Sequence, residues 1–77
     1  MLKIGELSKR AHVSADTLRL YERRGLIQSE RLSNGYRVYH PQVERLVHLI
    51  KQGQRIGFTL REMADIVKLL DEGDMST

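Results

Sequence analysis

The chain of 77 residues contains no cysteine. It therefore has no disulfide, no thiolate metal site and no thiol redox centre, and its composition suits a reducing cytoplasm. It also lacks an apolar run near the roughly 20 residues that a membrane-spanning helix needs. The first residues, from Met1 to Glu6, lack the apolar core of a signal peptide. We expect one soluble, cytoplasmic domain with no membrane partner.

Residues that bind metals or carry catalysis are also sparse. Three histidines, His12, His40 and His48, are scattered along the chain without helical i, i+4 pairing. The sequence therefore predicts no metal site and no cofactor. No nucleophile, base and orienting group form a recognisable set, so we predict no catalytic residues and no enzyme. The net charge of +3, from 13 Lys and Arg against 10 Asp and Glu, is compatible with a polyanionic partner.

Two short helices are predicted in the first third of the chain. Apolar residues recur at helical spacing over residues 4–11. Ser14 is a good N-cap for a second helix, which Gly25 is placed to end in a left-handed conformation. One edge of this second helix carries Asp16, Arg19 and Arg23. A short amphipathic helix with such side chains on one face suits the major groove of DNA.

A β-hairpin is predicted about ten residues after the second helix. Asn34 and Gly35 both tolerate positive φ, which makes this pair a strong hairpin signal. Strand alternation would place Tyr36 and Val38 on one face and Arg37 and Tyr39 on the other, with Arg37 held outward. Arg31 would lie across the hairpin. A helix followed at this distance by a hairpin is the outline of a winged helix-turn-helix.

Two further helices are predicted in the second half. The third begins at Pro41, the only proline, and ends at Gly57. Its polar face carries Lys51, for which a solvated face and contact with the DNA backbone both stay open. The core-facing stripes of the third and fourth helices are formed by Val43, Leu46, Val47, Ile50, Leu60, Met63, Ala64 and Val67.

The fourth helix has a clear start and an unusually broad apolar face. Thr59 and Glu62 form a capping box at its beginning. Ile66, Leu69 and Leu70 widen the apolar face beyond what a lone surface helix needs. This predicts an exposed patch of the kind that marks an interface. Residues 71–77 are acidic and small, and we expect a flexible tail there.

Five short motifs stand in an order that is typical of one family. They are Ile4–Leu7, Val13–Glu22, Gly25-Leu26, Gly35–Tyr39 and Gly57–Glu62. Over about residues 3–70 the chain resembles the N-terminal DNA-binding domain of the MerR family of bacterial transcription regulators. The resemblance implies a mainly α fold, a four-helix winged helix-turn-helix with a short β-hairpin wing, over residues 1–70. Position 20, usually aromatic in the family, is Leu20 here.

The resemblance also implies partners. They are double-stranded DNA, RNA polymerase at a promoter that the regulator distorts, and a second copy of the full-length protein. Residues 71–77 would be a flexible tail or the start of a linker to the dimerisation helix of the family, and the fragment alone is expected to be monomeric.

The DNA-binding residues are predicted from the residue pattern and the resemblance together. Arg19 and Asp16 would read bases, and the tyrosines and the other arginines of helix and wing would contact phosphates. The full set is Asp16, Thr17, Arg19, Tyr21, Arg23, Arg31, Tyr36, Arg37, Gln54 and Arg55. The arginines could instead be solvated helix charges, Tyr21 a core aromatic, and Gln54 and Arg55 part of a solvated face.

Two other functions share these features. One is a stand-alone architectural DNA-binding protein of the excisionase kind, which needs no dimerisation helix. The other is a protein-interaction module that binds through the apolar face of the fourth helix, and it would show no salt-dependent DNA binding.

Overall fold

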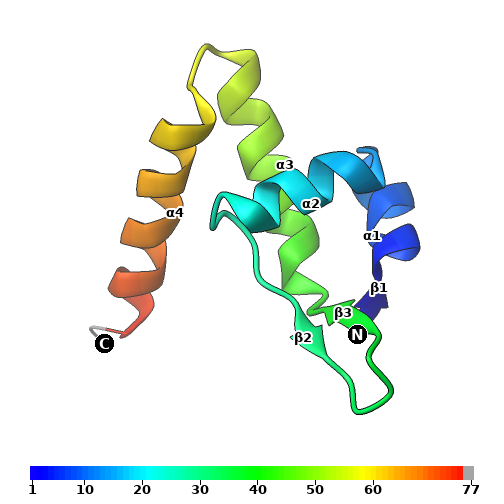
Figure 1. The fold of residues 1–77 in the computed structure, drawn as a ribbon. Helices are drawn as coiled ribbons and strands as arrows, with labels where there is room; N and C mark the ends of the chain where they lie inside the picture. Colours follow the sequence, from blue (N-terminus) through cyan, green and yellow to red (C-terminus); the bar gives the residue numbers. More distant parts are fainter. Residues whose placement is uncertain (76–77) are drawn as a thin grey trace.

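The structure is a computed structural model that describes residues 1–75, with the side chains of residues 1–70. Within that range four helices pack together, and a small sheet of three strands lies at one end of them (Figure 1). The elements are β1 (Leu2–Lys3), α1 (Ile4–Ala11), α2 (Ala15–Arg23), β2 (Glu30–Arg31), β3 (Arg37–Tyr39), α3 (Gln42–Arg55) and α4 (Leu60–Met75). The predicted mainly α, winged helix-turn-helix fold is confirmed. No helix in the described part combines the length and apolar character required to cross a bilayer.

The turn between α1 and α2 is built from local signals. His12 takes the left-handed conformation, with φ of 57°, and so ends α1. Ser14 caps α2, because its hydroxyl oxygen accepts the backbone N–H of Thr17 at 3.1 Å. Gly25, with φ of 78°, follows the end of α2, as predicted. These residues define where α1 ends and where α2 begins and ends.

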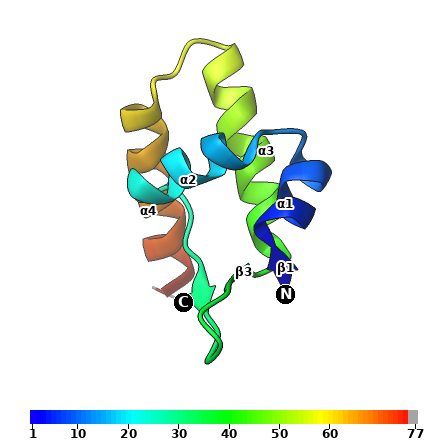
Figure 2. The same cartoon turned by 45° about the vertical axis from the view of Figure 1, so that its right-hand side comes forward.

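The sheet is antiparallel with the strand order β1-β3-β2, and the first strand was not predicted. Leu2 pairs with Tyr39, and Arg31 pairs with Arg37. A strand of two residues is too short to show any alternation in sequence. Its pairing attaches the N-terminus to β3, while the hairpin between β2 and β3 projects away from the helices (Figures 1 and 2).

Burial along β3 does not follow the predicted faces of the strand. Val38 and Tyr39 are both buried, whereas Tyr36 is 62% exposed. Tyr36 precedes the strand, which begins at Arg37, so the alternation does not extend to it. Arg37 and Tyr39 share a side of the strand, but the strand runs from the projecting wing into the core. One residue of that side is therefore exposed and the other is buried.

The hairpin is confirmed, but its turn differs from the expected one. Gly35 is left-handed, with φ of 89°, whereas Asn34 is not among the described residues with positive φ. Gly35 N–H donates to the Leu32 carbonyl at 2.9 Å, and Leu32 N–H donates to the Tyr36 carbonyl at 2.8 Å. This longer loop needs a single left-handed residue. Asn34 instead accepts the Tyr36 N–H through its side chain, at 3.2 Å.

The core lies between α3 and the other elements, with α1 and α4 on opposite sides of α3 (Figures 1 and 2). The predicted stripes of α3 and α4 face it, and the predicted Thr59–Glu62 capping box is present. Ile66 is partly buried against this core, so its assignment to an exposed edge was wrong. Leu69 and Leu70 are 67% and 54% exposed. The helix continues to Met75, beyond residue 70, where we placed the end of the domain, and residues 76–77 of the expected tail lie outside the described residues.

Candidate nucleic-acid interface

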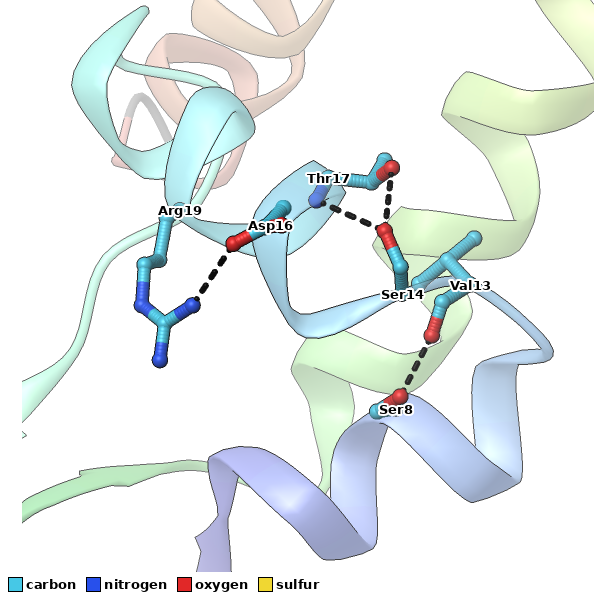
Figure 3. A network of polar contacts seen from close by, with 6 residues as sticks. All are labelled: Ser8, Val13, Ser14, Asp16, Thr17 and Arg19. Atoms are coloured by element: carbon cyan, nitrogen blue, oxygen red, sulfur yellow. Dashed lines mark hydrogen bonds and ion pairs between the residues drawn. The ribbon is translucent and has the colours of Figure 1, made fainter.

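The first turns of α2 present an arginine and an acid side by side (Figure 3). Arg19 donates to the Asp16 carboxylate at 2.9 Å, and the Asp16 side chain is 93% exposed. Thr17 lies beside them, but its hydroxyl contacts the Ser14 hydroxyl at 2.9 Å and so belongs to the helix cap. The Arg19 and Asp16 side chains are thus exposed and can contact a binding partner, while Thr17 supports the turn of the helix that carries them.

Helix α2, which has the place of the recognition helix in a helix-turn-helix, and the wing formed by β2 and β3 share a cationic hollow of about 380 Å³, which we call the arginine hollow. Arg19 and Arg23 of α2 and Arg37 of β3 line it together with Glu22. The structure thus brings together three of the predicted DNA-binding arginines, from segments that lie 14 or more residues apart in sequence. Three guanidinium groups around one hollow attract an anionic group such as a phosphate.

Among the residues that the structure describes, Glu22 is the one acid that lines the arginine hollow, and sequence reasoning did not assign it a role. Its carboxylate accepts the Tyr39 hydroxyl at 2.7 Å and the Ser29 hydroxyl at 2.7 Å. Arg37 lies 3.7 Å from it. Burial by itself would raise the pKa of Glu22, but the two hydrogen bonds and the charges of Arg37 and Arg31 outweigh it and hold the pKa below its ordinary value.

The wing residues lie on the same side as the arginine hollow. Tyr39 is fully buried, and burial together with its hydrogen bond to Glu22 raises the pKa of Tyr39 to about 12. Arg31 of β2 is exposed and pairs in register with Arg37 of β3. Tyr36 is exposed at the base of the turn. Arg31, Tyr36 and Arg37 therefore form the outward surface of the wing.

Two lysines that sequence reasoning missed extend this surface. Lys3 and Lys9 line a second hollow, of about 540 Å³, together with Arg19, Tyr36 and Arg37. The Lys3 ammonium lies 5.6 Å from the centre of the Tyr36 ring, a cation–π contact. In sequence the two lysines look like ordinary solvated charges. The pairing of β1 with β3 places Lys3 next to the wing, and Lys9, in the last turn of α1, lines the same hollow.

Tyr21 and Gln54 contact each other across the domain. The Tyr21 ring is only 3% exposed, and its hydroxyl donates to Gln54 Oε1 at 2.9 Å. Burial raises the pKa of Tyr21. The structure thus gives Tyr21 the position of a core aromatic whose polar end reaches the surface beside Gln54. Arg55, the next residue of α3, is exposed and lines a different hollow from the arginines of α2.

Lys51 has a structural role that the sequence did not indicate. Its ammonium donates to the Ala11 carbonyl at 3.0 Å and to the His12 carbonyl at 3.1 Å. These carbonyls lie at the C-terminal end of α1, where a cation also complements the helix dipole. The Lys51 ammonium is thus bound within the domain, and its side chain holds α3 against the turn of the helix-turn-helix.

The described residues contain no group of three or more His, Asp or Glu side chains placed to hold a metal ion. What they do contain is a capped recognition helix, a projecting hairpin and a cationic surface between them. This combination defines a winged helix-turn-helix DNA-binding domain.

Comparison with known proteins places the domain in a family. The model of the MerR family regulatory protein matches residues 3–39. The chain is 41% identical over 73 residues to the mercuric resistance operon regulatory protein of Bacillus cereus, an alignment that covers 94% of this chain. The transcription regulator PbrR691 of Ralstonia metallidurans CH34, solved with lead(II), matches 95% of this chain at 32% identity, with a TM-score of 0.84. The chain belongs to the MerR family, and its fold is the winged helix-turn-helix DNA-binding domain of that family.

A more distant structure shares the fold. HiNmlR, a MerR family regulator lacking the sensor domain and solved bound to promoter DNA, matches 87% of this chain at 20% identity, with a TM-score of 0.78. The chain spans about half the length of these proteins: 55% of the Bacillus regulator, 57% of PbrR691 and 54% of HiNmlR. All three relatives are regulators by name, and PbrR691 is a transcription regulator.

Proposed function

We propose that this domain binds promoter DNA with α2 in the major groove and the hairpin wing on the neighbouring backbone. The observation that carries the proposal is the arginine hollow, where Arg19 and Arg23 of α2 meet Arg37 of the wing. Arg19, oriented by Asp16 at 2.9 Å, reads bases. The other side chains act on phosphates and set the register of the domain on the duplex. They are Tyr21, Arg23, Arg31, Tyr36, Arg37, Gln54 and Arg55, with Thr17 supporting the helix start.

The salt dependence of binding tests this proposal. Each phosphate that a basic side chain neutralises releases counterions, so affinity should fall steeply as salt rises. Fluorescence anisotropy on a duplex carrying the promoter, repeated over a range of salt concentrations, measures this slope. A flat dependence would contradict DNA binding and favour a protein-interaction module.

We further propose that the whole regulator acts as a dimer at a promoter that it distorts for RNA polymerase. Leu69 and Leu70 of α4 are exposed, and a separate hollow of about 590 Å³ lies between the end of α3 and the first turns of α4, where Met63 and Ile66 line it. Ile56 and Phe58 at the rim of this hollow are 78% and 39% exposed. Apolar surface of this kind marks an interface. The segment after residue 70 would lead into the dimerisation helix, which would pack beside α4.

Sedimentation tests the assembly. Residues 1–77 alone should be monomeric in dilute solution, bind a half-site weakly, and gain affinity when two copies are joined, because two recognition helices about one DNA turn apart, ~34 Å, then bind together. A stable dimer of residues 1–77 that Leu69→Lys leaves unaffected would show that assembly uses another surface.

A further inference from the structure

Glu22 is a carboxylate at the centre of a surface that should attract phosphates. It lines the arginine hollow with Arg19, Arg23 and Arg37. A negative charge in that position repels DNA and partly neutralises the arginines around it. Electrostatic attraction alone would favour a neutral residue there. Its presence therefore calls for a role other than attraction of DNA.

The contacts of Glu22 join two parts of the DNA-binding surface. One carboxylate oxygen accepts the Tyr39 hydroxyl at 2.7 Å, and the other accepts the Ser29 hydroxyl at 2.7 Å and lies 3.7 Å from Arg37. Ser29 follows α2, and Tyr39 and Arg37 belong to the central strand of the wing sheet. The side chain is only 22% exposed. A single carboxylate of the recognition helix is thus bound at both oxygens to the segment that carries the wing.

We propose that Glu22 is a positioning residue that fixes the wing against the recognition helix, so that Arg37 meets a phosphate in the register in which Arg19 reads bases. The inference rests on the proposed DNA binding. Strands β2 and β3 contain two and three residues, and a hairpin this short is marginal on its own. Holding it in place before DNA arrives lowers the ordering cost of binding.

Two opposite effects of Glu22→Gln separate positioning from simple charge repulsion. Glutamine has nearly the same shape, but its NH₂ group cannot accept a hydrogen bond and it carries no charge toward Arg37. Removal of the charge should raise affinity for any DNA. Loss of the second acceptor should loosen the wing and lower the preference for the correct sequence. A positioning role for Glu22 therefore predicts that Glu22→Gln lowers the ratio of the affinity for the correct sequence to the affinity for random DNA.

The experiment compares a duplex that the wild-type protein enriches from a randomised pool with a random duplex of equal length. Glu22→Gln should lower the ratio of the two affinities by about tenfold, which is within the range of coupling between residues in one contact network. Glu44→Gln is the matched control. Glu44 lies on α3, outside the arginine hollow, and is 3.6 Å from Arg10 of α1. Glu44→Gln should therefore leave the ratio of the two affinities unchanged.

The coupling to Arg37 tests the route of the effect. In an Arg37→Ala background, Glu22→Gln should change the ratio little. A displaced Arg37 draws α2 out of the register in which Arg19 reads bases, whereas without Arg37 no wing cation is left to displace α2, so Arg37→Ala by itself keeps the ratio of the wild type. A wild-type ratio in Glu22→Gln, with affinity for both duplexes raised alike, would overturn the inference. If thermal unfolding shows that Glu22→Gln does not fold, Tyr39→Phe carries the test, because it removes one donor and keeps the buried ring. Absence of salt-dependent binding by the wild-type protein would instead refute the proposed function.

Discussion

Arg37→Ala is the most direct test of the wing. The Arg37 side chain is about half exposed, at 49%, and lies in the arginine hollow of α2 and the wing. In the free domain it stands 3.7 Å from Glu22, and an ion pair this exposed contributes little. A DNA phosphate can therefore displace Glu22 from the guanidinium at small cost. The substitution should remove one phosphate contact and leave base reading by α2 intact.

The magnitude follows from counterion release. One neutralised phosphate contributes about −0.9 to the slope of log affinity against log salt, which is ~3.5-fold in affinity between about 50 and about 200 mM salt. Arg37→Ala should therefore make the slope shallower by about one and weaken binding to cognate and random duplexes alike. Fluorescence anisotropy at four or more salt concentrations measures both quantities.

Arg10→Ala is the matched control for that measurement. Arg10 carries the same charge and pairs with Glu44 at 3.6 Å, but it lines neither of the two basic hollows. Its removal should leave the slope unchanged. Equal slopes for Arg37→Ala and the wild type would refute the placement of Arg37 on a phosphate. Equal changes of slope in Arg37→Ala and Arg10→Ala would also refute it, because they would indicate only a diffuse effect of net charge.

Three further outcomes are expected. Arg19→Ala should cost about 1–3 kcal/mol on the cognate site and relax the preference at one base position, as measured by selection from randomised duplexes; equal weakening on random DNA would exclude base reading. Lys51→Met should lower the free energy of unfolding by about 1–2 kcal/mol, because the carbonyls of Ala11 and His12 lose a charged donor. The Tm should fall by about 4–8 °C per kcal/mol, and an unchanged Tm in circular dichroism would contradict a stabilising role for Lys51 at the end of α1. The pKa of Glu22 in the folded protein lies below its ordinary 4.5, so the contribution of Glu22 to the free energy of unfolding is present above pH 4.5 and is lost as the pH falls through the folded value. The free energies of unfolding in urea of the wild type and Glu22→Gln should therefore converge on acidification, and a difference that stays constant with pH would contradict this contribution.

Most of the helical framework could be predicted from the sequence, because its signals act within one or two turns. Ser14 binds the backbone three residues ahead, and Thr59 and Glu62 bind each other over the same separation. Gly25 adopts the left-handed conformation that its position required. Such contacts need no knowledge of the rest of the chain. For the same reason the predicted bounds of α1 and α2 agree with the structure.

The sequence was less informative where two segments meet. The faces predicted for β3 did not indicate that Tyr39 is buried, because burial of that ring depends on how the strand enters the core. Strand β1 was missed because two residues show no periodicity. The exposed edge of α4 was predicted too wide, since Ile66 packs on a core whose extent only the assembled helices define.

In the candidate site, too, local features could be predicted from the sequence and contacts between distant segments could not. The sequence by itself determined which cations the recognition helix and the wing carry, because helix caps and turn residues set those elements locally. Only the tertiary structure decided that Arg19, Arg23 and Arg37 share one hollow and that Glu22 binds Tyr39, 17 residues away. It also decided that Tyr21 binds Gln54, 33 residues on, and that Lys51 caps Ala11, 40 residues back. Contacts over such separations arise from the packing of whole elements, which the residues near each partner do not encode.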